Sequence, residues 1–399
     1  MAKITKLYET PDPPEQDLKD YKAKLFRHKA GQGARRLLYV GVVLGIVLGM
    51  WLFARNKTYA GYEVTASAER ADTLNTQYAE YNGKILKYSR DGISCVNLRN
   101  EAFWSQTYNM QTPILDVCQN AVVVADYEGN EAYVFNEQGL QTQITTLLPI
   151  QQVSISSQGV TALLLSDSSM SWICLYDLEG EKLTEAQCRL EETGQPLSIS
   201  ISSDGIKLAV SYLQVQSGLA NSCLVFYNFG NVGGNFVDKI VASAVYENLI
   251  IPRVQYLGDS ICAAVSEQGV IFYEGKEIPE EKAAAEEEGE IRSVFFGERS
   301  VGLVVDGTGE DSARYEAHVY NAEGNRILTR STNLAYNNIK LSGGDLILYN
   351  ENECEIYTER GTLRYTGTFD GAVADIYKGS GFRRYIIVFS DRTEEIKLK

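Results

Sequence analysis

The side chains most often used in catalysis or metal binding are sparse in this chain and stand apart from one another. Histidine occurs only at His28 and His318. Seven cysteines are scattered without a C-x-x-C pair: Cys95, Cys118, Cys174, Cys188, Cys223, Cys262 and Cys354. Zinc, iron–sulfur and haem-attachment sites need these residue types at close, regular spacing. The sequence therefore predicts no metal site, and we expect the cysteines to be buried free thiols.

Common catalytic motifs are also missing. The chain has no G-x-S-x-G elbow, P-loop, H-E-x-x-H helix or dinucleotide-binding glycine pattern. His318 stands in the strand-like stretch "AHVYN", which favours a hydrogen-bonded sheet histidine, and "SSDG" at 202–205 favours a hairpin turn over a calcium loop. Acidic residues are so numerous that no carboxylate pair for sugar hydrolysis can be singled out. We predict no catalytic residue and no cofactor.

Charge is divided unevenly along the chain. The formal charge is −15, but residues 1–60 carry eleven Lys/Arg against five Asp/Glu, a balance of +6 that leaves −21 for residues 61–399. A domain this acidic repels polyphosphate. DNA and RNA are therefore not expected as partners.

One uncharged, mostly apolar run predicts a membrane anchor. Leu37 to Ala54 are eighteen residues, about 27 Å of helix, with Tyr39 and Trp51 near the two ends. Cations before the run outnumber those after it, which predicts residues 1–36 as a basic cytoplasmic tail and 55–399 as an extracytoplasmic domain of a single-pass cell-membrane protein. The alternative is a cleaved signal peptide. Residues 14–29 could form a membrane-surface or docking helix, or a solvated tail whose cations set topology.

The rest of the chain repeats a strand–turn–strand pattern. Hairpins such as "SISSDGIKLAVS" turn near residues 83, 120, 159, 205, 259, 298, 344 and 381, and each is followed by a second hairpin of the type "CLYDLEGEKL". The mean spacing of about 43 residues is typical of propeller blades with four antiparallel strands. We therefore predict an all-β fold, an eight-bladed β-propeller, with seven blades as the alternative.

Closure of the ring supports the count of eight. The last repeat has three strands before the chain ends, and residues 61–70, "GYEVTASAER", form an extra strand before the first repeat. We expect this strand to complete the last blade, because the pairing removes exposed sheet edges.

Two segments interrupt the period. Residues 214–236 lengthen the fourth blade with a Gly- and Asn-rich excursion that could carry contacts, since long irregular loops often do. Residues 279–290, "PEEKAAAEEEGE", predict a short acidic helix or a mobile surface loop.

The repeats resemble known propellers. "SISSDGIKLAVS" is similar to the turn of WD-repeat-like propellers, with Ser203 where Pro usually stands, and "VNLRNEAFWSQTY", with Trp104, resembles a pyrroloquinoline-quinone-type repeat. The whole chain resembles an uncharacterised family of membrane-anchored propellers in Gram-positive bacteria, known as a domain of unknown function. Quinone enzymes have a calcium site and often adjacent cysteines; this chain has no adjacent pair, so the resemblance implies a scaffold without a cofactor.

Two functions remain open at this point. The first is a propeller anchored in the lipid bilayer through residues 37–54 that binds a protein or cell-envelope partner. The second is an extracytoplasmic hydrolase or sugar-processing enzyme with carboxylates in the propeller channel. Carboxylates converging in the channel would favour the enzyme, and a channel of Ser, Tyr and apolar groups would disfavour it.

Overall fold

The computed structural model describes residues 38–49, 57–70, 72–73, 75–167, 170–188, 194–216, 218–307 and 313–399. The chain divides into two compact units, Met1–Lys57 and Thr58–Lys399. Described residues of the first unit form one helix over 38–49, and all named strands belong to the second unit.

The helix over 38–49 is the described part of the predicted membrane span. It is about 18 Å long at the usual rise, and each of its described side chains is exposed. No helix within the described ranges is both long enough and apolar enough to cross a membrane. Positions 37 and 50–54 of the predicted span, the basic tail and His28 lie outside the described residues. The transmembrane helix is therefore not confirmed.

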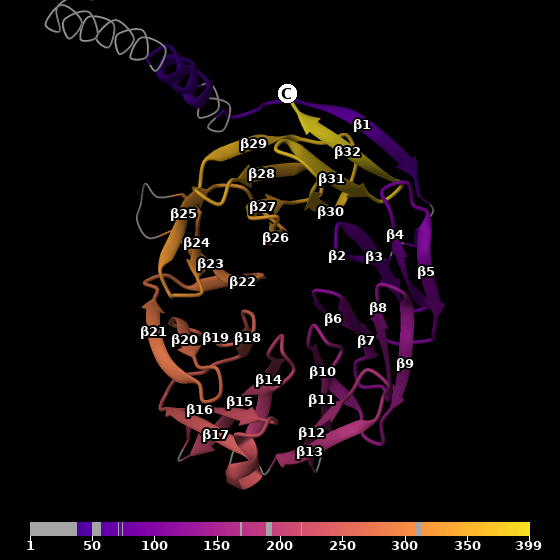
Figure 1. Ribbon diagram of the computed structural model, residues 1–399, viewed down its shortest axis with the longest axis vertical. Helices are drawn as coiled ribbons and strands as arrows, with labels where there is room; N and C mark the ends of the chain where they lie inside the picture. Colours follow the sequence, from indigo (N-terminus) through magenta and orange to yellow (C-terminus); the bar gives the residue numbers. More distant parts are fainter. Residues whose placement is uncertain are drawn as a thin grey trace, which may run out of the picture. The chain divides into compact units, whose positions relative to one another are not determined.

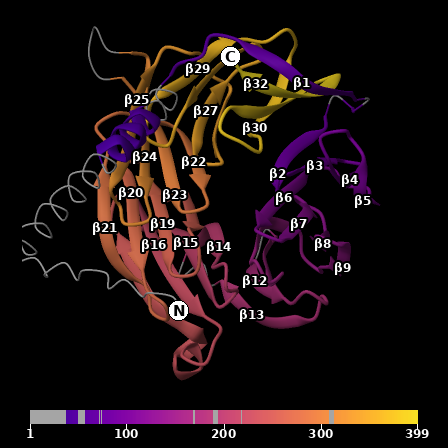
Figure 2. The same ribbon diagram turned by 45° about the horizontal axis from the view of Figure 1, so that its top comes forward.

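Eight four-stranded antiparallel sheets, the blades, stand around a common centre in the second unit (Figure 1). The first strand of each blade lies nearest the centre and the fourth lies on the outside, and the tilted view shows the blades standing on edge (Figure 2). The prediction of an all-β, eight-bladed propeller is confirmed, and the seven-bladed alternative is wrong.

The first four blades follow the chain in order, each from the inner to the outer strand. Their strands are, for blade 1, β2 (Gln77–Tyr81), β3 (Lys84–Ser89), β4 (Gly92–Val96) and β5 (Ala102–Thr107); for blade 2, β6 (Pro113–Cys118), β7 (Ala121–Asp126), β8 (Glu131–Asn136) and β9 (Gly139–Thr145); for blade 3, β10 (Ile150–Ile155), β11 (Thr161–Ser166), β12 (Ser171–Tyr176) and β13 (Lys182–Cys188); and for blade 4, β14 (Gln195–Ile201), β15 (Lys207–Gln216), β16 (Leu219–Asn228) and β17 (Ile240–Tyr246).

Blade 4 also carries two single-turn 3₁₀ helices between its outer strands, η1 (Gly233–Asn235) and η2 (Val237–Lys239). The remaining strands are, for blade 5, β18 (Arg253–Tyr256), β19 (Ile261–Ser266), β20 (Gly269–Glu274) and β21 (Glu280–Glu286); for blade 6, β22 (Ile291–Gly297), β23 (Ser300–Asp306), β24 (Tyr315–Asn321) and β25 (Arg326–Thr332); for blade 7, β26 (Asn338–Ser342), β27 (Asp345–Tyr349), β28 (Glu353–Tyr357) and β29 (Leu363–Thr368); and for blade 8, β30 (Val373–Lys378), β31 (Arg384–Phe389), β32 (Arg392–Leu398) and β1 (Tyr62–Glu69).

Burial follows the radial order of the strands. Middle strands such as β7 (AVVVAD) and β19 (ICAAVS) are buried on both faces, because each blade packs against a neighbour on either side. Outer strands such as β13 (KLTEAQC) alternate between exposed and half-buried positions. Continuous apolar runs are typical of strands covered on both faces, and alternating runs of strands that face solvent. The hydrophobic core therefore consists of layers between consecutive blades.

The ring is closed by strands from opposite ends of the chain. β1 pairs antiparallel with β32 from Tyr62↔Leu398 to Glu69↔Arg392, and Figure 1 shows the two ends of the colour scale side by side. Directly after β1, where the chain continues toward blade 1, the buried Arg70 guanidinium donates to Asp72 and to Thr393 Oγ1, each at 2.7 Å. Blade 8 is thereby completed by a strand that precedes blade 1 in the sequence.

The loops are sorted onto two faces of the ring. Loops that join the first to the second and the third to the fourth strand of a blade lie at one end, here called the hairpin face; the other loops, including those between blades, lie at the connector face. Gly205, in the predicted "SSDG" turn, has a φ of 72° and lies at the hairpin face. There, Gly205 N donates to Ser202 O and Ser202 N to Lys207 O, both at 2.8 Å, as a tight hairpin requires.

The acidic segment 279–290 differs from its predicted structure. It contains β21, the outer strand of blade 5, where a short helix or mobile loop was expected. Ala283 and Ala285 alternate with acidic or exposed positions and pack against the core between blades 5 and 6. Tertiary pairing with β20 thus overrides the helical preference of an Ala- and Glu-rich stretch.

The predicted excursion in blade 4 has two parts. β15 and β16 extend past both neighbouring strands as a two-stranded arm, with the pairs Gln214↔Asn221, Val215↔Ala220 and Gln216↔Leu219. The pairing with β14 ends at Leu213 and the pairing with β17 begins at Ser222, so no other described strand flanks the arm. The arm projects at the connector face, and the 3₁₀ turns lie toward the hairpin face.

Candidate functional site in the channel wall

The innermost strand of each blade lies along the centre of the ring. Short polar side chains of one blade accept hydrogen bonds from backbone N–H groups of the next blade. Each of these bonds runs from a backbone N–H to a side-chain oxygen one blade earlier: Ile155 N to Asp116 Oδ2 (2.8 Å), Ile201 N to Ser154 Oγ (3.1 Å), Val254 N to Ser198 Oγ (3.1 Å), Tyr256 N to Ser200 Oγ (2.8 Å) and Lys378 N to Ser342 Oγ (2.9 Å). Buried N–H groups without partners are costly. These residues therefore serve blade-to-blade pairing.

Three carboxylates lie on the innermost strands, where the predicted hydrolase would need them, and Asp116 is one of the three. Burial raises its pKa above the ordinary value for an aspartate, and the backbone N–H groups of Ile155 and Val117 oppose this. With one oxygen bonded to Ile155, Asp116 acts as a link between blades 2 and 3. The other two carboxylates, Glu80 and Asp375, line a cavity elsewhere in the channel wall.

A cavity of about 370 Å³ opens in the channel wall between blades 6 and 1. It is lined by side chains from β2, β22, β26, β27 and β30: Tyr78, Ala79, Glu80, Phe296, Asn338, Ile339, Lys340, Leu341, Tyr349, Asp375 and Tyr377. Ligand pockets usually measure about 300–1,000 Å³ and combine apolar walls with a few polar groups. The lining of this cavity has that composition, and its volume lies near the lower end of that range.

Lys340 and Asp375 form an ion pair inside this cavity. The Lys340 ammonium contacts Asp375 Oδ1 and lies 3.8 Å from the centre of the Tyr377 ring. A quarter of the lysine side chain stays exposed, and the residue lines the cavity. Burial lowers the pKa of Lys340 below its ordinary value, and attraction to Asp375 only partly offsets this. An ammonium with so little solvation depends on its carboxylate and its aromatic neighbour.

The same carboxylate accepts further bonds on one of its oxygens. Tyr349 Oη donates to Asp375 Oδ1 at 2.7 Å, and the N–H of Ile376 donates to it at 2.8 Å. Glu80, from blade 1, accepts a bond of 2.7 Å from Ser342 Oγ on Oε2. Among the hydrogen bonds of the described residues, none uses Asp375 Oδ2 or Glu80 Oε1.

Tyr377 has an unsatisfied hydroxyl. The residue is 2% exposed, and its Oη interacts with the nearby Asp375 but makes no well-formed hydrogen bond. Burial raises the pKa of Tyr377 well above its ordinary value, so the hydroxyl stays protonated and able to donate. A buried hydroxyl without a partner costs free energy unless something else binds it.

Little in the sequence indicates this site. Lys340 and Asp375 are 35 positions apart, in the stretches "NNIKLSGG" and "VADIYK", and neither was singled out. The signal available was a charged residue in the middle of each inner strand, Lys340 in β26 and Asp375 in β30. The two side chains meet only because blades 7 and 8 pack against each other.

His318 is a buried sheet histidine, as expected. Its Nδ1 lies 2.8 and 2.9 Å from the two carboxylate oxygens of Glu287, the residue after β21 in blade 5. Burial alone would raise the pKa of Glu287, but bonds from His318 and Tyr320 together lower it below its ordinary value. Arg326 donates to Glu287 at 3.3 Å. The cluster holds blades 5 and 6 together at the periphery, away from the channel.

The other residues noted in the sequence have structural roles. All seven cysteines are free, and every one except the half-buried Cys118 is buried. Trp104 stacks on Phe135 with ring centres 4.9 Å apart, between blades 1 and 2. Within the described residues, no group of three His, Cys, Asp or Glu side chains could hold a metal ion.

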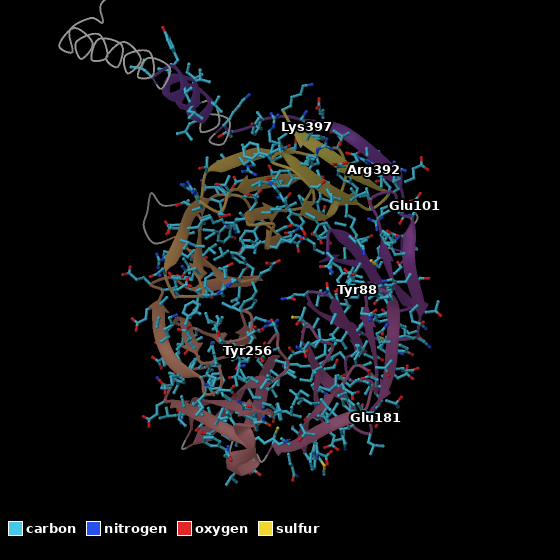
Figure 3. All side chains as sticks on the ribbon, in the orientation of Figure 1. Tyr88, Glu101, Glu181, Tyr256, Arg392 and Lys397 are labelled. Atoms are coloured by element: carbon cyan, nitrogen blue, oxygen red, sulfur yellow. The ribbon has the colours of Figure 1, made fainter. Side chains whose placement is uncertain are left out.

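The connector face of blades 2 to 4 is the second notable surface. A pocket of about 170 Å³ there is lined by uncharged groups: Tyr127, Gln151, Gln152, Leu164, Ser166, Gln195 and Pro196. Large apolar side chains at the same end of these blades are exposed: Tyr127, Leu147, Met170, Val215, Leu219 and Val245. Charged residues such as Glu101, Glu181 and Lys397 lie on the outer rim of the ring (Figure 3).

Comparison with known proteins gives one family match. The profile described as "Family of unknown function (DUF5711)" matches residues 55–398, and no curated protein matches the sequence. BamB from Moraxella catarrhalis is similar at 9% identity over 85% of this chain and 100% of that one, with a TM-score of 0.49. The Pan2 WD40 domain from Neurospora crassa is similar at 10% identity over 72% of this chain and 88% of that one, with a TM-score of 0.44. Similarities this distant say nothing about a ligand or partner.

Proposed function

This chain belongs to the DUF5711 family of unknown function, and from that premise we propose that it is a membrane-tethered propeller that binds a protein partner through the connector face of blades 2 to 4. The observation that carries the proposal is the arm of β15 and β16. The arm projects beyond its own sheet and bears Val215 and Leu219, whose exposed fractions are 69% and 56%.

The chemistry of this face favours a protein over a charged polymer. Its pocket offers amide, hydroxyl and proline groups, which complement a peptide backbone, and its exposed side chains are apolar. An unflanked two-stranded arm can also accept an added strand, a common mode of peptide recognition. The charge of −21 on residues 61–399 disfavours nucleic acid.

The second part of the proposal is the membrane tether. It is supported by the uncharged run over 37–54, by the cations that precede it and by the exposed apolar side chains over 38–49. In this proposal the N-terminus is cytoplasmic and the propeller lies outside the membrane. Thr58, the first residue of the propeller unit, donates to Leu363 O at the hairpin face, the end opposite the arm.

A site-specific photo-crosslinking experiment in cells tests the partner surface. A photoreactive amino acid at Val215 or Leu219 of the full chain should capture a protein. The matched control is Val237, which is 84% exposed at the other face of the same blade. Crosslinks at Val215 but not at Val237 support the proposal; equal capture at both, or none at either arm position, contradicts it.

The location outside the membrane has its own test. Protease added to intact cells should digest the propeller, whereas the tail should be cut only after the cells are opened. A propeller that survives in intact cells and is cut only in opened cells would contradict the orientation.

An enzyme acting through channel carboxylates is the second candidate. Glu80 and Asp375 do share one cavity, which is the observation in its favour. Each already has a hydrogen-bonding partner, however: Ser342 for Glu80, and Lys340 and Tyr349 for Asp375. One oxygen of each carboxylate is thus already engaged, and the enzyme remains the second candidate.

A further inference from the structure

We propose that the channel-wall cavity between blades 6 and 1 is a binding site for a neutral polyhydroxylated ligand, namely a single sugar unit. The proposed protein partner binds at the connector face, whereas this cavity lies in the channel wall and has so far been given no ligand. Some polar groups in the cavity are already engaged by neighbouring residues, and others remain available to a ligand.

The cavity is closed to a cation because it already contains one. The Lys340 ammonium sits over the Tyr377 ring and contacts Asp375, which is the position that a ligand cation would take. A second cation would have to displace it or lie beside it, and like charges repel at such distances.

An anion is disfavoured for the opposite reason. Lys340 is already neutralised by Asp375, and Glu80 adds a further negative charge to the same wall. The surrounding residues 61–399 are strongly acidic as a whole. A phosphate or carboxylate would therefore meet net repulsion.

Several hydrogen-bonding groups of the residues that line the cavity are not fully engaged. Asp375 Oδ2 and Glu80 Oε1 can accept, the Lys340 ammonium has N–H groups beyond the one directed at Asp375, and the Tyr377 hydroxyl is buried beside Asp375 without a well-formed hydrogen bond. A hydroxyl group can donate to a carboxylate and accept from an ammonium at once. A ligand carrying adjacent hydroxyls satisfies these groups together.

The walls of the cavity suit a ring with apolar faces. Phe296, Leu341 and Tyr349 line it beside the polar groups, and its volume of about 370 Å³ lies at the small end for ligand sites. A sugar ring presents C–H groups on its faces and hydroxyls at its edge. The arrangement of apolar wall and converging polar groups matches that chemistry.

The unsatisfied Tyr377 hydroxyl supplies a sharp test. In Tyr377→Phe the ring stays in place and only the hydroxyl is lost, so folding should be kept and stability should be unchanged or slightly raised. Tyr256→Phe is the matched control, because Tyr256 also has a buried hydroxyl without a partner but lies on β18 of blade 5, outside the cavity (Figure 3).

Binding is measured on the full chain by ligand-observed NMR with glucose, galactose and N-acetylglucosamine, and with inorganic phosphate and spermidine as charged comparators. We expect at least one of the sugars to bind, Tyr377→Phe to weaken it about threefold to tenfold, and Tyr256→Phe to leave it unchanged. Silence from all three sugars, equal binding by the Tyr377→Phe variant, or binding of phosphate or spermidine in their place would overturn the proposal.

A second measurement needs no variant. An amine-specific reagent should modify Lys340 more slowly when the bound sugar saturates the chain, while Lys182, whose side chain is 47% exposed on blade 3, is modified at an unchanged rate. Equal rates for Lys340 with and without the sugar would likewise overturn the site.

Discussion

Buried polar side chains hold neighbouring blades together at several points of the ring. Asp345 of blade 7 accepts from Arg364 at 3.0 Å and from Tyr385 of blade 8 at 2.5 Å. The Glu287–His318 contact does the same for blades 5 and 6. Such groups are stable only when fully bonded, so removing one partner is costly.

Glu287→Gln should therefore destabilise the propeller by about 1–3 kcal/mol at neutral pH, because it takes a charge from bonds to His318, Tyr320 and Arg326. Glu280→Gln, on the exposed part of β21, is the control and should change little. Urea unfolding measures both. Equal stability of the two variants would show that the cluster contributes nothing.

The same carboxylate should make stability depend on pH. The pKa of Glu287 is lowered in the folded chain, so its contribution is present above the ordinary glutamate pKa and is lost as the pH falls through the folded value. The difference in melting temperature between the wild-type chain and Glu287→Gln should thus shrink on acidification below about pH 4.5. A difference that grows there would contradict the sign of this shift.

At the scale of elements, turn chemistry and period predicted the blades well, whereas composition misled at one strand. The positions of the eight first hairpins could be read from Gly, Asp and Asn between apolar runs, because these residues supply the turn conformations. β21 was missed because "EEKAAAE" has helical composition, and only pairing with β20 decides its state. The Lys340–Asp375 site could not be predicted, since it depends on how blades 7 and 8 pack against each other.

The closing strand is the element on which the ring depends most. Arg70 fixes its end: it bonds Asp72 and Thr393 and lies 4.7 Å from the Tyr78 ring centre. Arg70→Met should cost about 3 kcal/mol, because Asp72 loses one of its two cationic partners. Arg99→Met, at an exposed position, should cost little. Equal urea midpoints for the two variants would argue against this role of Arg70.

The arm of blade 4 should be dispensable for folding. Replacing residues 214–221 by Asn-Gly joins Leu213 to Ser222 with a short hairpin turn; the strand pairings with β14 and β17 are kept, and the bond from Asn248 N to Asn221 Oδ1 is lost. The free energy of unfolding should stay within about 1 kcal/mol of wild type, while photo-crosslinks from the connector face disappear. A photoreactive residue at Met170 monitors this face in the shortened chain. Unfolding of the shortened chain, or undiminished crosslinks, would contradict the proposed separation of fold and binding.

The propeller as a whole is a closed ring of eight blades that presents two distinct surfaces. A blade alone leaves both faces of its sheet uncovered, so each depends on its two neighbours. The channel wall then brings together residues from blades 6, 7, 8 and 1, which no single repeat contains. Both proposed sites therefore require the ring to be closed.

Hydrogen–deuterium exchange of the full chain, followed by mass spectrometry, tests this closure most directly. Among the described strands β1 pairs with β32 alone, from Tyr62 to Glu69, so peptides covering this stretch should be protected to the same degree as the outer strands of other blades, such as β9 and β13. Rapid exchange across residues 62–69, with those outer strands protected, would show an open ring and contradict the account.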